Sequence, residues 1–219
     1  FVGLPVTAFG RTFDRAEKDD LIRLFQKGFE TLLLLVVPIM IGGSLIAREI
    51  VVAIGKESFA PAAGVLQLLL IAVGASFLNS LSGHTITIIN KQRSMVWGYL
   101  MVALVGVLAY VLLIPRLSYY GAAIGTIITE VLAAVIGYFM ILKTISFKLH
   151  LMIFWKLAVA GGSMALVMVW LRPVQPWFAL IVGSAAYLVA IIATRALPIS
   201  LVQEVFQRSS SAKALPPTL

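Results

Sequence analysis

Residues 121–142 read GAAIGTIITEVLAAVIGYFMIL, a run that is apolar or small except for two threonines, a tyrosine and one carboxylate, Glu130. A helix needs about 20 apolar residues to cross the hydrocarbon core of a bilayer, so this run predicts a membrane-spanning helix. Similar runs predict five more spans, at residues 31–47, 60–89, 95–114, 151–171 and 177–194. Residues 1–10 are interpreted as the end of an earlier helix, and the start at Phe1 indicates the C-terminal portion of a longer protein. The expected fold class is all-α, a polytopic transmembrane helix bundle with about six full spans plus the end of an earlier one.

Composition agrees with a membrane protein. The 219 residues are 61% hydrophobic and 12% charged, with a mean hydropathy of +1.03, whereas soluble domains have about 25% charged residues. The net charge of +8 does not predict a nucleic-acid partner, because the basic residues lie at span ends and in loops, where they anchor helices at the lipid interface. The chain has no cysteine, which excludes disulfides and thiolate metal sites.

The basic residues also predict the orientation. Alternate loops carry thirteen and four of the seventeen Lys and Arg residues. The positive-inside rule places the richer side in the cytoplasm, together with the polar tail at residues 195–219. On that side the loop 11–27 mixes both charges and predicts an amphipathic surface helix with Leu21, Leu24 and Phe25 on one side. Aromatic residues near the predicted span ends indicate an interfacial belt: Trp97, Trp155, Trp170, Trp177, Tyr119 and Tyr120.

Glu130 is the first candidate for function, because it lies near the middle of a span. A carboxylate there costs roughly 2.5 to 3.5 kcal/mol on the insertion scale, so it faces the bundle interior or a wet cavity, or is protonated. No Lys or Arg lies mid-span to neutralise it. Its partner is then a neutral group such as Asn79 or a threonine, or lies outside this chain. Two interpretations stay open: a role in proton or substrate coupling, and an interhelical hydrogen bond that fixes packing.

A stripe of small and polar residues marks the span at 60–89. Spacings of four, three and four place its members on one helix face: Ser76, Ser80, Gly83 and Thr87. Such a face can line an aqueous cavity, but small residues also allow two helices to pack closely. For this stripe we favour the packing interpretation. Asn79, beside the stripe, is the better cavity candidate because its amide needs partners.

The quoted span and the span at 31–47 carry two helix-packing features. Gly121 and Gly125 form a GxxxG pattern, which is typical of helix association, and Thr126 precedes Glu130 on a second small or polar face. Pro38 either kinks its helix or frees a carbonyl. Whether that kink is a hinge or merely a common membrane-helix feature stays open.

Lys91 and Arg93 follow the span at 60–89 on the predicted cytoplasmic side. Basic residues at that depth can bind anionic headgroups, although simple anchoring of the topology is the favoured interpretation. No enzyme is predicted: there is no metalloprotease or phosphate-binding motif, and Gly161-Gly162-Ser163-Met164-Ala165 lacks the final glycine of a serine elbow. No cofactor or metal is expected.

Three segments carry a family resemblance. The first is Leu4-Pro5 to Arg11 followed by Leu32 to Pro38, and the second is the run Phe77-Leu78-Asn79 to Arg93. The most specific is Leu113-Ile114-Pro115 followed by Tyr120 to Thr126 and Glu130. All three are similar to the C-terminal half of polysaccharide-biosynthesis flippases. That family belongs to the multidrug, oligosaccharidyl-lipid and polysaccharide exporter superfamily. The resemblance covers about residues 1 to 145, and the last two spans match only in being apolar.

The resemblance implies a transporter lobe at residues 1–145, two additional helices at 146–194 and a cytoplasmic tail at 195–219. It implies a multi-pass protein of the bacterial inner membrane that moves undecaprenyl-diphosphate-linked oligosaccharide by alternating access. The implied partners are that substrate, membrane lipids, an N-terminal lobe, and glycan polymerase and assembly proteins. The family binds substrate partly through cationic cavity residues, and this chain has no mid-span cation, so those contacts are expected upstream.

Two alternatives stay open. A multidrug cation antiporter of the same superfamily would need acidic residues in the N-terminal lobe. A non-transporting membrane subunit that scaffolds a glycan-assembly complex would show no transport when purified.

Overall fold

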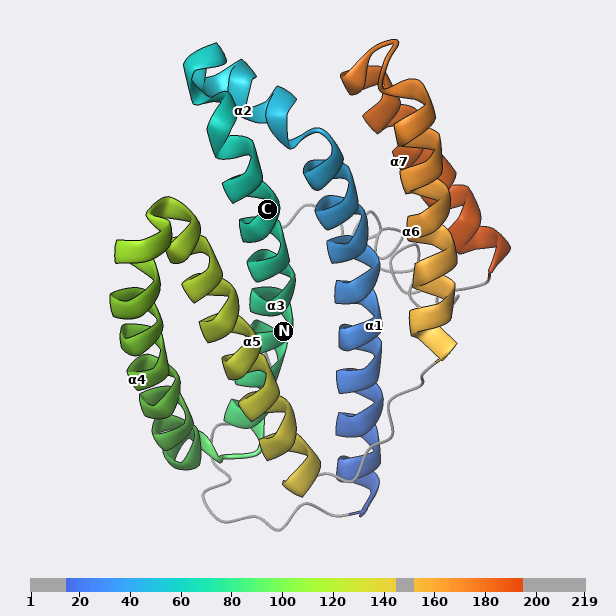
Figure 1. Ribbon diagram of the computed structural model, residues 1–219. Coiled ribbons are helices and arrows are strands. Elements are labelled where there is room, and N and C mark those ends of the chain that lie inside the picture. The colour runs from blue at the N-terminus through green and yellow to red at the C-terminus, as the bar shows by residue number, and fades with distance from the viewer. Residues whose placement is uncertain (1–14, 145–151, 195–219) are drawn as a thin grey trace, which may run out of the picture.

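The computed structural model describes residues 15–144 and 152–194, with side chains from residue 20 onward. The sequence interpretations of residues 1–10 and 195–219 therefore lie outside the described residues. The described chain is helical and contains no strand (Figure 1). Its elements are α1 Arg15–Leu45, α2 Ala47–Gly55, the 3₁₀ helix η1 Glu57–Ala62, α3 Ala63–Ile88, α4 Gln92–Leu117, α5 Tyr119–Thr144, α6 Met152–Leu171 and α7 Pro176–Ala193.

Six helical segments of the described chain are long and apolar enough to cross a membrane: α1, η1 with α3, α4, α5, α6 and α7. This confirms the predicted all-α bundle with six full spans. Helices α4 and α5 extend the predicted spans by two or three residues at each end, since polar residues such as Gln92 and Thr144 still fit a helix end at the lipid interface, whereas α6 and α7 match the predicted spans to within one residue.

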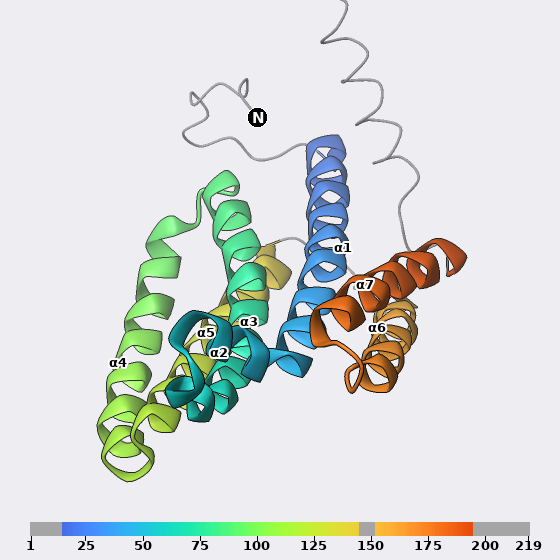
Figure 2. The ribbon, with the colours of Figure 1, turned by 90° about the horizontal axis from the view of Figure 1, so that it is seen from above.

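The six spans form two groups that share α1. In the first group α5 packs extensively against both α3 and α4, and α3 also packs against α1. In the second group α6 and α7 form a hairpin that rests mainly on α1 (Figures 1 and 2). Helix α1 is thus the element through which the hairpin is attached to the rest of the bundle.

The start of α1 differs from the prediction. The charged segment before Thr31 is not a separate surface helix, because α1 runs without a break from Arg15 to Leu45. Leu21 and Phe25 are buried as expected, but Leu24 is 61% exposed. Residues four apart lie nearly in line on a helix, whereas Leu24 is turned away from the line that joins Leu21 and Phe25.

Pro38 lies inside α1 and frees a carbonyl, one of the two effects expected of it. Proline has no N–H, so the carbonyl oxygen of Leu34 lacks its helical donor. The hydroxyl of Tyr187 in α7 donates to that oxygen at 2.9 Å, and the tyrosine is 2% exposed. The free acceptor of α1 is therefore satisfied by the neighbouring hairpin.

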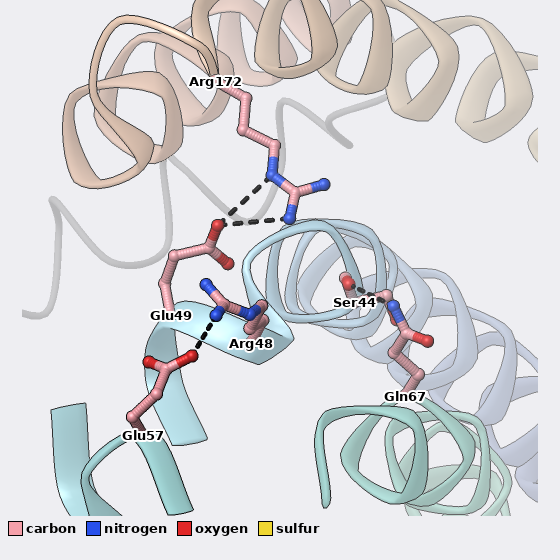
Figure 3. Close-up of polar contacts among 6 residues, drawn as sticks. All are labelled: Ser44, Arg48, Glu49, Glu57, Gln67 and Arg172. Carbon is pink, nitrogen blue, oxygen red and sulfur yellow. Dashed lines mark hydrogen bonds and ion pairs between the residues drawn. The ribbon is translucent and has the colours of Figure 1, made fainter. Parts of the chain in front are cut away.

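Helix α1 is separated from α2 by a break at Ile46. There the side-chain amide of Gln67 in α3 donates to the carbonyl oxygen of Ser44 at 2.9 Å (Figure 3). Side-chain donors commonly satisfy carbonyls at a helix end. The break is thus held by α3, and it turns the short helix α2 toward the end of the bundle at which the α6–α7 connection also lies (Figure 1).

Two ion pairs gather at this end. Arg172, after α6, donates through Nε and Nη2 to Oε1 of Glu49 in α2, at 3.3 and 3.1 Å. Arg48 pairs with Glu57 of η1 (Figure 3). The first pair links the α6–α7 hairpin to α2, so the hairpin is fixed both at this end and at Leu34 within α1.

The helix directions sort the loops into two ends, as the charge count assumed. Counted from residue 20 onward, the end that holds the α3–α4 connection and the starts of α1 and α6 carries six described basic residues, whereas the opposite end carries four (Figure 1). The first end, called the basic end below, has Arg23, Lys27, Lys91, Arg93, Lys143 and Lys156. The predicted belt residues lie near helix ends, and all are exposed: Trp97, Trp155, Trp170, Trp177, Tyr119 and Tyr120.

Candidate functional site

Glu130 lies midway along α5 and is partly buried. One of its carboxylate oxygens, Oε2, is inaccessible to solvent and has no hydrogen-bond partner among the described residues. A buried polar atom without a partner carries a free-energy cost of about 1–3 kcal/mol, and more for a charged group. This oxygen is an acceptor that a proton, a cation or a donor group of a ligand would satisfy.

Asn79 of α3 and Tyr99 of α4 converge on the same region. The Tyr99 hydroxyl donates to Oδ1 of Asn79 at 3.2 Å and lies within electrostatic range of the Glu130 carboxylate. Helices α3 and α4 thus contribute a hydrogen-bonded amide and phenol, and the charge of Glu130 on α5 acts on that phenol. We call these three residues the polar cluster: Asn79, Tyr99 and Glu130. The structure places no hydrogen bond between Asn79 and Glu130 Oε2, so Asn79 is not the partner that the sequence suggested for this oxygen.

Thr126 lies one turn before Glu130 on α5, on the side of the helix that faces α4. Its hydroxyl is 3.2 Å from the hydroxyl of Tyr110 in α4 and also donates to the carbonyl oxygen of Ala122 at 3.0 Å. The threonine therefore extends the line of polar contacts between α4 and α5 without bonding to Glu130. The contact between α4 and α5 therefore has polar side chains along more than one helical turn.

The GxxxG pattern of α5 makes that contact close. A Cβ atom at Gly125 would lie 2.6 Å from the ring of Tyr110, and one at Gly121 would overlap the carbonyl of Leu113. Any larger residue would push α4 away from α5. The predicted association face is thus observed, and its partner is the preceding helix.

Thr87 does not belong to the polar cluster. It is exposed near the basic end of α3, and its hydroxyl donates to the carbonyl oxygen of Gly83 at 3.0 Å. Lys91 and Arg93 follow it at the α3–α4 connection, where both side chains are exposed. Neither pairs with a described carboxylate. They lie at the end of the helices and are separate from Glu130, which is in the middle of α5.

The small-residue stripe of α3 is not its main packing face. Ser80 and Thr87 are exposed, whereas Ser82 and Thr85 are buried against the neighbouring helices. Their hydroxyls donate to the carbonyl oxygens four residues earlier, at 3.1 and 2.9 Å, so they need no partner on another helix. A Cβ atom at Gly137 of α5 would meet Ser82, which shows where α3 and α5 pack closely.

Comparison with protein-family models, curated proteins and solved structures finds no match to this chain. Among the described residues, no group of three or more His, Cys, Asp and Glu side chains is placed to hold a metal ion.

Two members of this region were missed from the sequence, Tyr99 and Tyr110. Each is a tyrosine inside an apolar span, and a hydroxyl within the membrane needs a hydrogen-bond partner. That need was a usable signal, although it does not say which helix supplies the partner. Together the described contacts give a mid-membrane site with one unsatisfied acceptor, Glu130 Oε2, beside a hydrogen-bonded amide and phenol.

Proposed function

We propose that this chain is the C-terminal lobe of a flippase that moves undecaprenyl-diphosphate-linked oligosaccharide across the bacterial inner membrane by alternating access, for polysaccharide biosynthesis. The observation that carries the proposal is the unsatisfied, buried oxygen of Glu130 in the middle of a span. Ionisable residues at that depth are rare and mark substrate or ion pathways. The resemblance of residues 113–126 and Glu130 to polysaccharide flippases supports the same proposal.

In this proposal the polar cluster belongs to the face of the lobe that borders the translocation pathway. Glu130 takes up a proton or a cation in one state and releases it in the other, which couples the rocking of the two lobes to an ion gradient. The sugar headgroup crosses through a hydrated pathway while its lipid tail stays in the bilayer, and no covalent bond changes. The charge asymmetry of the loops supports a cytoplasmic C-terminus.

The proposal is tested with the full-length protein in vesicles that contain a fluorescent undecaprenyl-diphosphate oligosaccharide. A membrane-impermeant quencher reports the fraction of glycan on the outer face. The protein is expected to raise the quenched fraction with time, and the rate should respond to an imposed proton or sodium gradient. Quenching equal to that of protein-free vesicles would contradict flippase activity.

The same carboxylate favours a second candidate, a multidrug cation antiporter of the same superfamily. An acceptor oxygen without a partner suits an organic cation as well as a proton. Uptake of a fluorescent organic cation into the same vesicles separates the two functions. Cation uptake without glycan movement would favour the antiporter.

A further inference from the structure

A cleft of about 280 Å³ lies between α1, α3 and α5, on the half of these helices nearer the basic end. Helix α3 packs against both α1 and α5, whereas α1 and α5 make little contact with each other. Phe29 of α1, Leu78 of α3 and Ala134 of α5 contribute to its walls. The cleft is distinct from the polar cluster, none of whose three members lines it.

The walls of the cleft are unsuited to water. A buried water typically needs two to four polar partners. Among the lining residues only Ser82 and Tyr138 carry polar side-chain atoms, and the Ser82 hydroxyl already donates to the carbonyl oxygen of Leu78 at 3.1 Å. A dry apolar cavity of about 150 Å³ is large enough to hold benzene, so this cleft has room for a longer piece of hydrocarbon.

The cleft opens sideways from the bundle. Val131 and Val135, which line it on α5, are 43% and 42% exposed. Both lie within a span, where the medium outside the protein is lipid hydrocarbon rather than water. Phospholipid chains are the most abundant hydrocarbon there, so they are favoured by mass action over any scarcer lipid.

The charges near the cleft favour an anionic headgroup. Arg23 and Lys27 lie two residues before and after Phe25 on α1, which places them on nearly the opposite face of that helix from the cleft but at the basic end of the bundle. Lys143 follows Tyr138 on α5 by roughly 7 Å along the helix axis, toward the same end. The carboxylates on this part of α1 are Glu17, Asp19, Asp20 and Glu30, fewer than the basic residues at this end of the bundle. Long basic side chains can extend to the membrane interface while their stems stay in apolar surroundings. Basic residues at that depth attract anionic lipids.

We propose that this cleft binds one acyl chain of an anionic phospholipid, whose phosphate lies among the basic residues at the same end of the bundle. The lipid fills the space that α1 and α5 leave open over α3 and stabilises their separation. This inference does not rest on flippase activity, since lipid binding is measured without transport.

The test uses the full-length protein purified in detergent, with retained lipid counted by native mass spectrometry after exchange into phosphatidylglycerol or phosphatidylcholine. The wild type is expected to retain one phosphatidylglycerol in preference to phosphatidylcholine. Ala134→Phe fills the cleft and should lose this lipid, whereas Ala103→Phe, at an exposed position of α4, should keep it. Equal retention by both variants, or retention of a polyprenyl diphosphate in place of phosphatidylglycerol, would overturn the proposal.

A second measurement holds even if Ala134→Phe does not fold. Phosphatidylglycerol with a photoreactive acyl chain is added to the wild-type protein, and the labelled residues are mapped by mass spectrometry. Labelling is expected at Phe29, Leu78 and Val135. Labelling spread evenly over the outer faces of α4 and α7, without enrichment at these three positions, would contradict a defined site.

Discussion

The Tyr187 hydroxyl donates a hydrogen bond to the carbonyl oxygen of Leu34. This is the carbonyl that lacks a helical donor because Pro38 has no N–H. In the membrane core an unsatisfied backbone acceptor has no water to bind, so its cost is high. The bond joins residues 153 positions apart. Proline in α1 and tyrosine in α7 thus act as a matched pair that attaches the α6–α7 hairpin to α1.

The variant Tyr187→Phe tests this pairing. It removes the donor and leaves the Leu34 carbonyl buried without a partner, so we expect a loss of about 1–3 kcal/mol in the free energy of unfolding. Unfolding of the purified protein in mixed micelles measures the change. Tyr119→Phe, at an exposed position, is the matched control and should change stability little.

A double-mutant cycle makes the test specific. Pro38→Ala restores an N–H that can bond the Leu34 carbonyl within α1. In that background Tyr187→Phe should be much less destabilising than in the wild type. If the cost of Tyr187→Phe is the same in both backgrounds, the hydroxyl does not act through the carbonyl that Pro38 frees.

Arg172→Gln tests the second attachment of the hairpin. Arg172 makes two bonds to Glu49, whose other oxygen is buried without a partner among the described residues (Figure 3). The arginine is 44% exposed, so solvent screening limits the loss to about 1 kcal/mol. The loss should shrink at high salt. Arg48→Gln breaks a more exposed pair and should cost less, and the opposite order would contradict the assigned role of Arg172.

The spans could be predicted because each is a property of consecutive residues. Apolar runs of sufficient length predict six spans, and the missing N–H of Pro38 indicates a free carbonyl from the sequence alone. The GxxxG pattern at Gly121 and Gly125 likewise indicates a close helix contact. Such features depend on local chemistry, which the order of residues contains directly.

The partners could not be predicted because they depend on which helices become neighbours. Tyr187 and Arg172 reach residues 153 and 123 positions away, and no local pattern specifies that pairing. The same holds for Tyr99, whose hydroxyl bonds to Asn79, the residue that the sequence suggested as a partner of Glu130. The continuity of α1 through Lys27 was missed for another reason: charge density suggested a surface segment, although charged residues are compatible with a helix that extends beyond the membrane.

Glu130→Gln tests the coupling role. The amide keeps the size of the side chain but cannot take up a proton or hold a cation as a carboxylate does. We expect glycan transport in vesicles to fall to background while the amount and stability of the protein stay near wild type, because a neutral group is easier to bury than a charge. Glu57→Gln, outside the apolar core of its span, should transport normally. Unchanged transport by Glu130→Gln would remove Glu130 from the mechanism.

Asn79→Leu tests whether the polar cluster acts as a unit. Leucine fits the apolar span but removes the acceptor of the Tyr99 hydroxyl, which then loses its one described partner. Transport should fall more than in Ser76→Ala, a smaller change one turn away on α3 that removes a hydroxyl outside the cluster. Tyr99→Phe should resemble Asn79→Leu, since either change breaks the same bond. If Asn79→Leu and Ser76→Ala reduce transport equally and slightly, the amide serves helix packing rather than the transport pathway.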